Sequence, residues 1–334
     1  MTVKLLMMTI SVVMVMFAIA NLVSVRAQDV SASKQSPATN GAPPPANPLK
    51  VAILHWYQAN RTASFKVGKL PYGVAFDGED IWSANNGDGT VSKIRASDGE
   101  NLGTFHVGYQ PMGLVFDGAN MWITDNGSTT ITKLRVSDGK NLGSFEVGPN
   151  IWFPAFDGAN VWIGSNVGNT GKVTKLRASD GKNLGTFSVP GCFAIAFDGT
   201  YIWLTTGGQG LNVIRLKEDG SNAGSFHAGG NPLGIAFDGA NIWVANAGDG
   251  TVSKLRAKDG AVLGTFNTPD VPYSIAFDGT NIWVTGSPFV VELRATDGVE
   301  LGRFRTPGSS TVGAAFDGAN IWVAATFDNA VHKF

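Results

Sequence analysis

One motif, Phe-Asp-Gly-x-x-x-Trp, occurs seven times in this 334-residue chain, and no other feature of the sequence restricts the fold as strongly. Consecutive copies begin 39 to 41 residues apart, at Phe76, Phe116, Phe156, Phe197, Phe237, Phe277 and Phe316. A period of about 40 residues with strand-rich content is typical of β-propellers, in which each repeat forms one blade. The motif therefore predicts an all-β fold, a seven-bladed propeller that spans residues 50–334.

The repeat from residue 232 to residue 266 shows what one blade contains. Four β-rich runs, at 233–237, 241–245, 252–256 and 262–266, are predicted to be its strands. Asp238-Gly239 separates the first two runs and Asp259-Gly260 the last two, and Asp-Gly pairs supply the positive-φ positions that tight hairpins need. Four antiparallel strands in each unit make one propeller blade.

The two ends of the repeat region predict how the ring closes. The last repeat stops after its third strand, at 330–334, and a run that matches the missing fourth strand stands at 63–67. The final blade then takes one strand from the N-terminal side and three from the C-terminal side, which removes an open sheet edge. A further run at 51–56 is predicted to lie outermost on this blade as a fifth strand.

Residues 1–27 are predicted to be a signal peptide. Lys4 precedes an apolar run at 5–18, and small residues at Ala18, Ala20 and Ala27 fit cleavage sites. An uncleaved membrane anchor is the alternative, because apolar character continues to Val25. Residues 28–49 are rich in Ser, Ala and Pro and are predicted to form a linker. Both alternatives place the propeller outside the cytoplasm, periplasmic or secreted, with membrane attachment only through an uncleaved N-terminus.

The net charge of the chain limits the classes of partner that it can bind. The formal net charge is −1, and removal of residues 1–27 takes away two positive charges, which gives −3. A mildly acidic domain is a poor nucleic-acid binder. The expected partner of this predicted monomer is a small molecule, a glycan, a peptide or an envelope protein.

The single cysteine, Cys192, allows no intramolecular disulfide and is predicted to be a buried, inert thiol.

The residues that recur in every repeat are predicted to be structural. Each Trp lies on a second strand, where its large apolar ring can fill the gap between neighbouring blades. The recurrent Lys and Arg of the third strand, such as Lys133 and Arg135, are expected near the turn acids on a solvated rim. Function in such a ring is expected where the blades differ.

Two variable positions lie on the face that carries the fourth-to-first-strand and second-to-third-strand loops, where propellers usually bind ligands. The first stands four residues before each motif Phe, at Tyr72, Met112, Trp152, Phe193, Leu233, Tyr273 and Val312. These side chains either plug the channel as core or line an aromatic pocket for a flat or apolar ligand. The third repeat is the outlier, because Phe153 stands where the other repeats have Gly, Ala or Ser.

The second variable position stands nine residues after each motif Phe and is polar in five repeats, at Asn85, Asp125, Ser165, Thr206 and Asn246. These side chains either cap loops or form a polar arc that contacts a ligand. The predicted ligand-binding residues are therefore Tyr72, Asn85, Met112, Asp125, Trp152, Phe153, Asn246 and Tyr273. No cofactor is expected, and the candidates for binding Ca²⁺ or Mg²⁺ are Asp125, Asp88 and Asp249.

The repeat units, such as Gly234-Ile235-Ala236-Phe237-Asp238-Gly239, resemble the YVTN and NHL classes of bacterial propeller repeats. That resemblance covers residues 51–334 and implies a binding or scaffolding module outside the cytoplasm. The units are also distantly similar to streptogramin B (virginiamycin B) lyases, which implies a histidine base and a glutamate-held magnesium ion. This chain departs from that pattern, because its second-to-third-strand loops carry neither a His nor that Glu.

Three hypotheses remain from the sequence. The first is a non-enzymatic binding or scaffold propeller with its site at the channel mouth. The second is a metal-dependent lyase or lactonase that uses Asp125 and neighbouring Asn side chains, although no spacing selects an acid–base pair. The third is a purely structural envelope protein, which a fully buried aromatic ring would favour.

Overall fold

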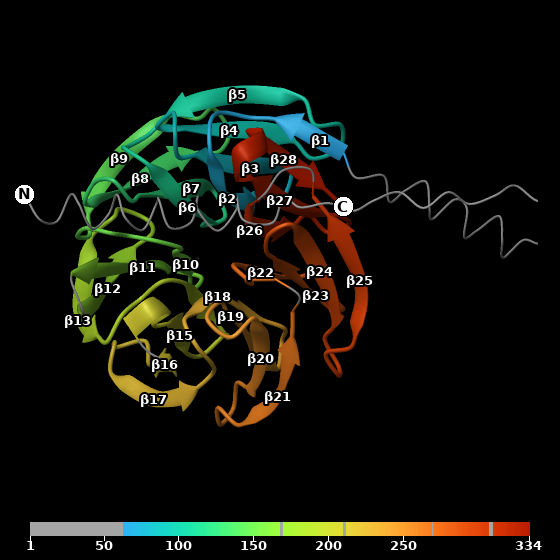
Figure 1. The fold of residues 1–334 in the computed structure, drawn as a ribbon. Coiled ribbons are helices and arrows are strands. Elements are labelled where there is room, and N and C mark those ends of the chain that lie inside the picture. The colour runs from blue at the N-terminus through green and yellow to red at the C-terminus, as the bar shows by residue number, and fades with distance from the viewer. Residues whose placement is uncertain (1–62, 168–169, 210–211, 269, 307–309) are drawn as a thin grey trace, which may run out of the picture. The chain divides into compact units, whose positions relative to one another are not determined.

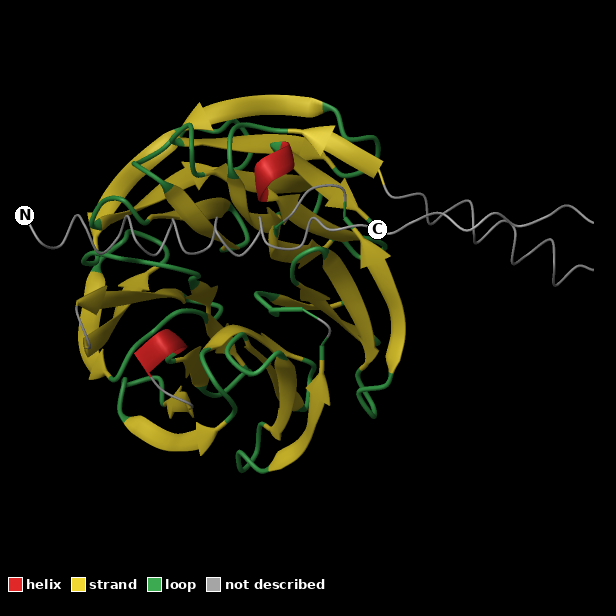
Figure 2. Cartoon of the chain, viewed as in Figure 1, coloured by secondary structure: helices red, strands yellow, loops and turns green. Residues whose placement is uncertain are grey.

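A computed structural model describes residues 63–167, 170–209, 212–268, 270–306 and 310–334. Seven four-stranded antiparallel sheets surround a central channel, and their order follows the chain (Figure 1). The predicted seven-bladed propeller is confirmed. Strands make up almost all of the regular structure (Figure 2), and two 3₁₀ helices, η1 (Gly207–Gln209) and η2 (Thr326–Asp328), lie in loops. None of the helices described is long and apolar enough to span a membrane.

Each blade runs from the channel outward in chain order. Blade 1 contains β2 (Pro71–Phe76), β3 (Asp80–Asn85), β4 (Thr90–Arg95) and β5 (Asn101–His106). Blade 2 contains β6 (Pro111–Phe116), β7 (Asn120–Asp125), β8 (Thr130–Arg135) and β9 (Asn141–Glu146). Blade 3 contains β10 (Ala155–Phe156), β11 (Asn160–Val167), β12 (Thr170–Arg177) and β13 (Asn183–Val189).

The second half of the ring repeats this order. Blade 4 contains β14 (Ile195–Phe197), β15 (Ile202–Thr205), β16 (Asn212–Leu216) and β17 (Asn222–His227). Blade 5 contains β18 (Pro232–Phe237), β19 (Asn241–Asn246), β20 (Thr251–Arg256) and β21 (Val262–Asn267). Blade 6 contains β22 (Ile275–Phe277), β23 (Asn281–Thr285), β24 (Phe289–Arg294) and β25 (Glu300–Arg305).

Blade 7 closes the ring as predicted. It contains β26 (Thr311–Phe316), β27 (Ile321–Ala325), β28 (Ala330–Lys333) and, as its outer strand, β1 (Ala63–Lys66). The β1–β28 ladder pairs Ser64 with His332 and Phe65 with Val331. The ring of Phe65 packs on Trp322 with centroids 5.3 Å apart, as fourth-strand Phe rings do elsewhere in the propeller. The fifth strand predicted at 51–56 lies outside the described residues.

The recurrent Asp and Trp of each motif form a clasp within the blade. The indole Nε1 of every motif Trp donates a hydrogen bond of 2.7 or 2.8 Å to the motif Asp, as Trp162 does to Asp157. Six of the seven tryptophans are fully buried, and Trp283 is 9% exposed. The indole rings therefore fill the spaces between sheets with their one polar atom satisfied, and the predicted structural role is confirmed.

The predicted solvated position of the third-strand cations is right for Arg and wrong for Lys, although Lys93 does pair with Asp77 and Asp80 at the turn. Arg135 and its counterparts are at least partly exposed and pair with turn acids, at 3.2 Å for Arg135 and Asp138. Lys133 is instead only 5% exposed, and its Nζ lies 4.9 Å from the centroid of the Trp122 ring. That Nζ donates to the Ala178 carbonyl of blade 3 at 2.6 Å. The burial is tolerated because the ammonium group gains a backbone acceptor and an aromatic face.

Equivalent cations link most neighbouring blades. Lys93, Lys175, Arg215, Lys254 and Lys333 each donate to a carbonyl of the next blade at 2.6 to 3.0 Å. Blade 6 carries Glu292 at this position, and its Oε1 accepts a 2.8 Å hydrogen bond from Asn281. Burial, followed by the nearby charge of Asp278, raises the pKa of Glu292. The contacts between blades 6 and 7 therefore differ in chemistry from those in the rest of the ring.

Candidate functional site

The residues that stand four before each motif Phe lie on, or two to three residues before, the inner strands β2, β6, β10, β14, β18, β22 and β26, which surround the centre of the ring (Figure 1). Met112, Phe193, Leu233 and Val312 are buried, with 3 to 9% of their surface exposed. Tyr72, Trp152 and Tyr273 keep an intermediate exposure. The partly exposed positions belong to blades 1, 3 and 6 and the buried ones to the blades between them, a mixture of the two alternatives that the sequence left open.

Four aromatic side chains meet across the channel and are called here the aromatic cluster: Trp152, Phe153, Phe193 and Tyr273. Trp152 stacks on Phe193 with centroids 4.6 Å apart. Phe193 also contacts Phe153 at 5.8 Å and meets Tyr273 edge-on at 5.7 Å. Because these residues come from blades 3, 4 and 6, the cluster reaches from one side of the ring towards the other.

Blade 3 is specialised where the sequence predicted an outlier. Its inner strand β10 is only two residues long, and Phe153 precedes that strand. The Phe153 N–H donates to the Phe193 carbonyl at 3.2 Å, and Phe153 forms a parallel bridge with Ala194 of blade 4. At the matching position of blade 2, a Cβ on Gly113 would lie 2.7 Å from the Trp152 carbonyl oxygen. Where a residue other than Gly stands at this position, as in blades 3, 4 and 6, the inner strand is shortened to two or three residues.

Two polar side chains of blade 2 fix the backbone of Trp152. Thr124 Oγ1 donates to the Trp152 carbonyl at 2.6 Å, and Thr124 is fully buried. Asn126 Nδ2 donates to the carbonyl of the preceding residue, Ile151, also at 2.6 Å. These hydrogen bonds fix the backbone from which the indole projects, which lowers the entropic cost of ordering this segment when a ligand binds.

The two tyrosines at the mouth are held in their neutral form. Burial raises the pKa of Tyr72 and, more strongly, that of Tyr273, and the neighbouring Tyr72 adds to the effect on Tyr273. Both phenols therefore stay protonated at neutral pH. Each presents an O–H group beside an apolar ring.

The predicted polar arc is buried within the blades. Asn85 Nδ2 donates to Thr90 and Ser92 at 3.0 and 2.9 Å. Asn246 is fully buried and makes the equivalent pair of bonds within blade 5. Asp125 is also fully buried and accepts hydrogen bonds from the Gly108 N–H at 3.0 Å and from Thr132 Oγ1 at 2.7 Å. Each side chain forms hydrogen bonds within its own blade, but the buried Oδ1 atoms of Asn85 and Asn246 have no hydrogen-bond partner among the described residues. The role of all three towards a ligand stays a prediction.

Asp125 titrates in an unusual range. Burial raises its pKa to about 6, although the hydrogen bonds from Thr132, Gly108 and Thr130 oppose that rise. The folded-state pKa thus lies above the value of about 3.9 expected in the unfolded chain. The native state therefore holds this proton more tightly, and the charged carboxylate lowers the stability of the fold as the pH rises through 6.

Replacement of Asp125 by Asn is expected to stabilise the propeller by about 2 kcal/mol at pH 8. The amide can accept from Gly108 and donate to the two threonines, as Asn85 does in blade 1. The advantage should fade towards pH 4. Urea unfolding of both proteins at pH 8 and pH 4.5 measures the difference in stability. Asn85→Asp is the reciprocal variant, and we expect it to be less stable than the native chain at pH 8. An Asp125→Asn protein less stable than the native chain at pH 8 contradicts this assignment.

The remaining metal candidates cap loops. Asp88 Oδ2 accepts the Lys69 N–H, and Asp249 Oδ2 accepts the Gly230 N–H. Within the described ranges, no three His, Cys, Asp or Glu side chains gather as a metal-binding group. The alternative of a metal-dependent lyase or lactonase therefore rests on the sequence expectation alone.

Cys192 directly precedes Phe193 of the aromatic cluster, whereas the histidines described lie on strands β5, β17 and β28. Cys192 is fully buried and burial raises its pKa, which fits the predicted inert thiol. His106 and His227 are exposed on the outer strands of blades 1 and 4. His332 is buried in blade 7, 3.3 Å from Asp328 Oδ2, and burial lowers its pKa.

Sequence reasoning missed three residues that shape the mouth. Phe193 is the centre of the aromatic cluster but was predicted only as one of seven channel residues. Thr124 and Asn126 position Trp152 through hydrogen bonds to backbone carbonyl groups, and such acceptors leave no mark in a sequence. The sequence did contain one signal for Phe193. It is aromatic at the position four residues before the motif Phe, as Trp152 is in the preceding repeat.

No protein-family model matches the chain, and no curated protein is significantly similar to it.

Proposed function

We propose that this propeller is a non-enzymatic binding protein that works outside the cytoplasm and holds a planar, apolar group at its aromatic cluster. The group belongs to a small molecule or to a peptide. Export is proposed from the apolar run at 5–18 and the small residues that follow it. The seven-bladed scaffold is compatible with this role and is shared by proteins of many functions.

The observation that carries the proposal is the continuous aromatic contact from blade 3 through blade 4 to blade 6. Stacked and edge-on pairs of this kind contribute about 0.5–1.5 kcal/mol each beyond the area they bury. Trp152, Phe153 and Tyr273 have intermediate exposure and pack against the buried residues around Phe193, and we propose that a ligand contacts the part of them that stays exposed. Clustered and partly exposed aromatic side chains are typical of binding hot spots.

The polar groups near the mouth support binding rather than catalysis. The Asn85 and Asn246 NH₂ groups and the Asp125 carboxylate form hydrogen bonds within their blades, and all three side chains are fully buried. Tyr72 and Tyr273 have raised pKa values because of burial, which makes them poor bases at neutral pH. Their hydroxyl groups are better suited to orient a ligand.

A fluorine NMR titration tests the proposal. The chain has nine Trp residues, and 5-fluorotryptophan labelling gives one resonance for each, with Trp152 assigned from a Trp152→Phe variant. Addition of indole, quinoline or 2-naphthol is expected to shift the Trp152 resonance while those of the buried motif tryptophans stay in place. A Tyr273→Ala variant should bind the same probe about tenfold more weakly, a loss of about 1.4 kcal/mol.

Met112→Ala is the matched control, because Met112 occupies the same position in blade 2 and lies outside the aromatic cluster. It should leave the affinity within about twofold of the native value. The proposal is wrong if no planar probe shifts the Trp152 resonance at millimolar concentration. It is equally wrong if Tyr273→Ala and the native chain bind the probe alike.

A further inference from the structure

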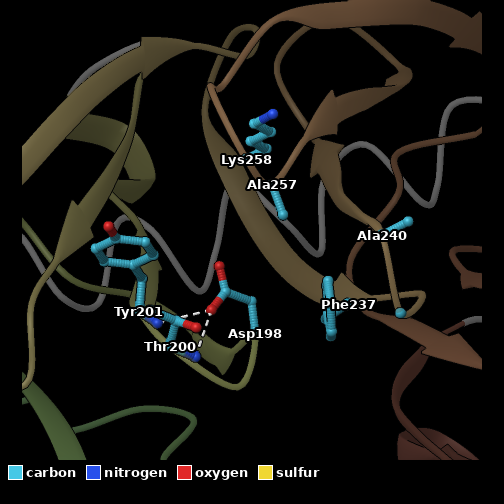
Figure 3. Close-up of a pocket in the computed structure, with 8 residues that line it drawn as sticks. Asp198, Thr200, Tyr201, Phe237, Ala240, Ala257 and Lys258 are labelled. Carbon is cyan, nitrogen blue, oxygen red and sulfur yellow. Dashed lines mark hydrogen bonds between the residues drawn. The ribbon is translucent and has the colours of Figure 1, made fainter.

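A second concave site lies between blades 4 and 5, on the face opposite the channel mouth. It is a pocket of about 200 Å³ formed by the turn between β14 and β15 and the turn between β20 and β21 (Figure 3). Its lining comes from Asp198, Thr200, Tyr201, Phe237, Ala257 and Lys258, together with the turn at 239–240. The carboxylate of Asp198 lies between Tyr201 on one side and Phe237 on the other (Figure 3).

Three departures from the repeat meet at this pocket. Tyr201 stands where five blades carry Asn and blade 1 carries Asp80. Lys258 stands where the other turns have Ser, Glu or Thr, and Arg215 replaces the usual third-strand Lys. In a ring of near-identical units, substitutions that serve general packing recur in every blade. Substitutions that converge on one pocket indicate a local function.

Arg215 joins the two walls of the pocket. Its guanidinium lies 4.6 Å from the centroid of the Tyr201 ring. It also donates to the backbone carbonyls of Ala257 and Lys258 at 3.0 and 3.1 Å. A planar guanidinium can stack on an aromatic ring and donate in its own plane at the same time. The orientation of Tyr201 is therefore coupled to the turn that carries Lys258.

The exchange of Asn for Tyr also changes the chemistry of Asp198. In blade 5, the Asn241 side-chain amide donates to both carboxylate oxygens of Asp238. Asp198 accepts from the backbone N–H groups of Thr200 and Tyr201 and from Trp203 Nε1, and a tyrosine ring has no amide to add. The Asp198 carboxylate thus retains acceptor capacity on the side that lines the pocket.

We propose that this pocket binds one neutral sugar unit of a glycan. Asp198 accepts hydrogen bonds from sugar hydroxyls, while Lys258 and the Thr200 hydroxyl donate to sugar oxygens. The rings of Tyr201 and Phe237 and the methyl group of Ala257 offer apolar surface to the C–H face of the sugar ring. An anionic ligand would be repelled by Asp198 and a cationic one by Lys258, so the mixed charges favour a neutral polyol. The site is open to solvent and its volume of about 200 Å³ is small for a ligand pocket, so a single ring is the largest unit proposed for it.

Saturation-transfer-difference NMR on the intact propeller tests this site. The probes are the methyl glycosides of glucose, galactose, mannose and N-acetylglucosamine, with galacturonic acid and glucosamine as charged comparisons. At least one neutral glycoside is expected to receive saturation at millimolar concentration. Tyr201→Asn restores the residue of five other blades and should weaken that binding at least tenfold, a loss of about 1.4 kcal/mol.

Lys258→Ser provides a second variant that is expected to fold, because Ser occupies this position in blades 1 to 3. It should reduce the affinity about threefold to tenfold, since it removes one donor but neither aromatic wall. Lys182→Ser, in the corresponding turn of blade 3, is the matched control and should leave binding unchanged. Trp152→Phe should also leave it unchanged, which separates this site from the aromatic cluster.

Three results would overturn the assignment. One is that none of the four neutral glycosides receives saturation. Another is that a neutral glycoside binds Tyr201→Asn as well as it binds the native chain. The third is stronger binding of galacturonic acid or glucosamine than of any neutral glycoside, which would mean that the pocket selects for charge.

Discussion

A chain that begins at residue 68 is expected to melt at least ~10 °C below a chain that begins at residue 62. The longer protein keeps β1, and the shorter one loses the outer strand of blade 7. That loss exposes the edge of β28 along the four residue pairs of the β1–β28 ladder and removes the Phe65 ring from Trp322. The missing contacts amount to about 5 kcal/mol, most of it from the aromatic side chain. Thermal unfolding followed by circular dichroism measures the difference.

Point variants separate ring closure from simple loss of packing. Phe65→Ala removes the ring and leaves the strand, and Phe226→Ala makes the same change in blade 4, where the fourth strand is continuous with its own repeat. Both should cost about 3 kcal/mol. If the truncation at residue 68 costs no more than Phe65→Ala, β1 does not close the ring as a strand. If a chain beginning at residue 62 is less stable than one beginning at residue 50, that loss would support the fifth strand predicted at 51–56.

The fold could be predicted from the sequence because the interactions that define a blade are local. The Trp82 indole donates to an Asp only five residues earlier, and the same bond recurs in all seven units. Each unit therefore carries its own turn, clasp and strand pattern within about 40 residues, and repetition makes that pattern visible. The last repeat contains only three strands, which predicted that an N-terminal strand closes the ring. The structure confirms this prediction, with Ala63–Lys66 as the fourth strand of blade 7.

The interactions between blades could not be predicted in the same way. Lys133 reaches a carbonyl oxygen 45 residues away, and a backbone acceptor has no residue type that a sequence could reveal. The expectation of a solvated Lys was reasonable from charge alone and was wrong for this reason. The aromatic cluster depends on how closely the inner strands approach, which brings Phe193 of blade 4 to Tyr273 of blade 6.

The polar position nine residues after each motif Phe shows the limit for site prediction. Asn85, Asp125 and Asn246 were expected either to cap loops or to contact a ligand, and the sequence contained no feature that separated the two. In the structure, each bonds to hydroxyl groups of the third strand of its own blade. A comparison of the repeats shows that Tyr201 differs from the Asn of most other blades. Only the structure shows that this residue lines a pocket.

The Asp–Trp clasp should be among the most sensitive points of each blade. Asp157 accepts hydrogen bonds from Trp162 Nε1 at 2.7 Å, from the Ala159 and Asn160 N–H groups at 2.9 and 2.6 Å, and from the Asn160 amide. Burial alone would raise the pKa of Asp157, but the hydrogen bonds from Trp162, Asn160 and Ala159 hold it below its usual value. Every group that faces this carboxylate is a donor.

Asp157→Ala is therefore expected to cost about 3–4 kcal/mol at pH 7, because it leaves a buried indole N–H and a turn without acceptors. Asp157→Asn should still cost about 2 kcal/mol, since its NH₂ group must face one of the donors. Urea unfolding measures both losses. Because the folded-state pKa is lowered, the stabilisation is present above the unfolded pKa of about 3.9 and is lost as the pH falls through the folded value. The difference between native and Ala proteins should thus shrink in acid.

A double-mutant cycle with Trp162→Phe isolates the indole–carboxylate bond from the turn. Trp162→Phe removes the donor and keeps an aromatic ring in the interface, so the coupling between the two positions reports this bond rather than the packing. We expect a coupling energy of about 1.5–3 kcal/mol at pH 7, typical of a buried hydrogen bond to a charged group. A coupling near zero would mean that Asp157 acts only through the turn, and the Nε1 bond would then be a consequence of the blade geometry rather than a cause of it.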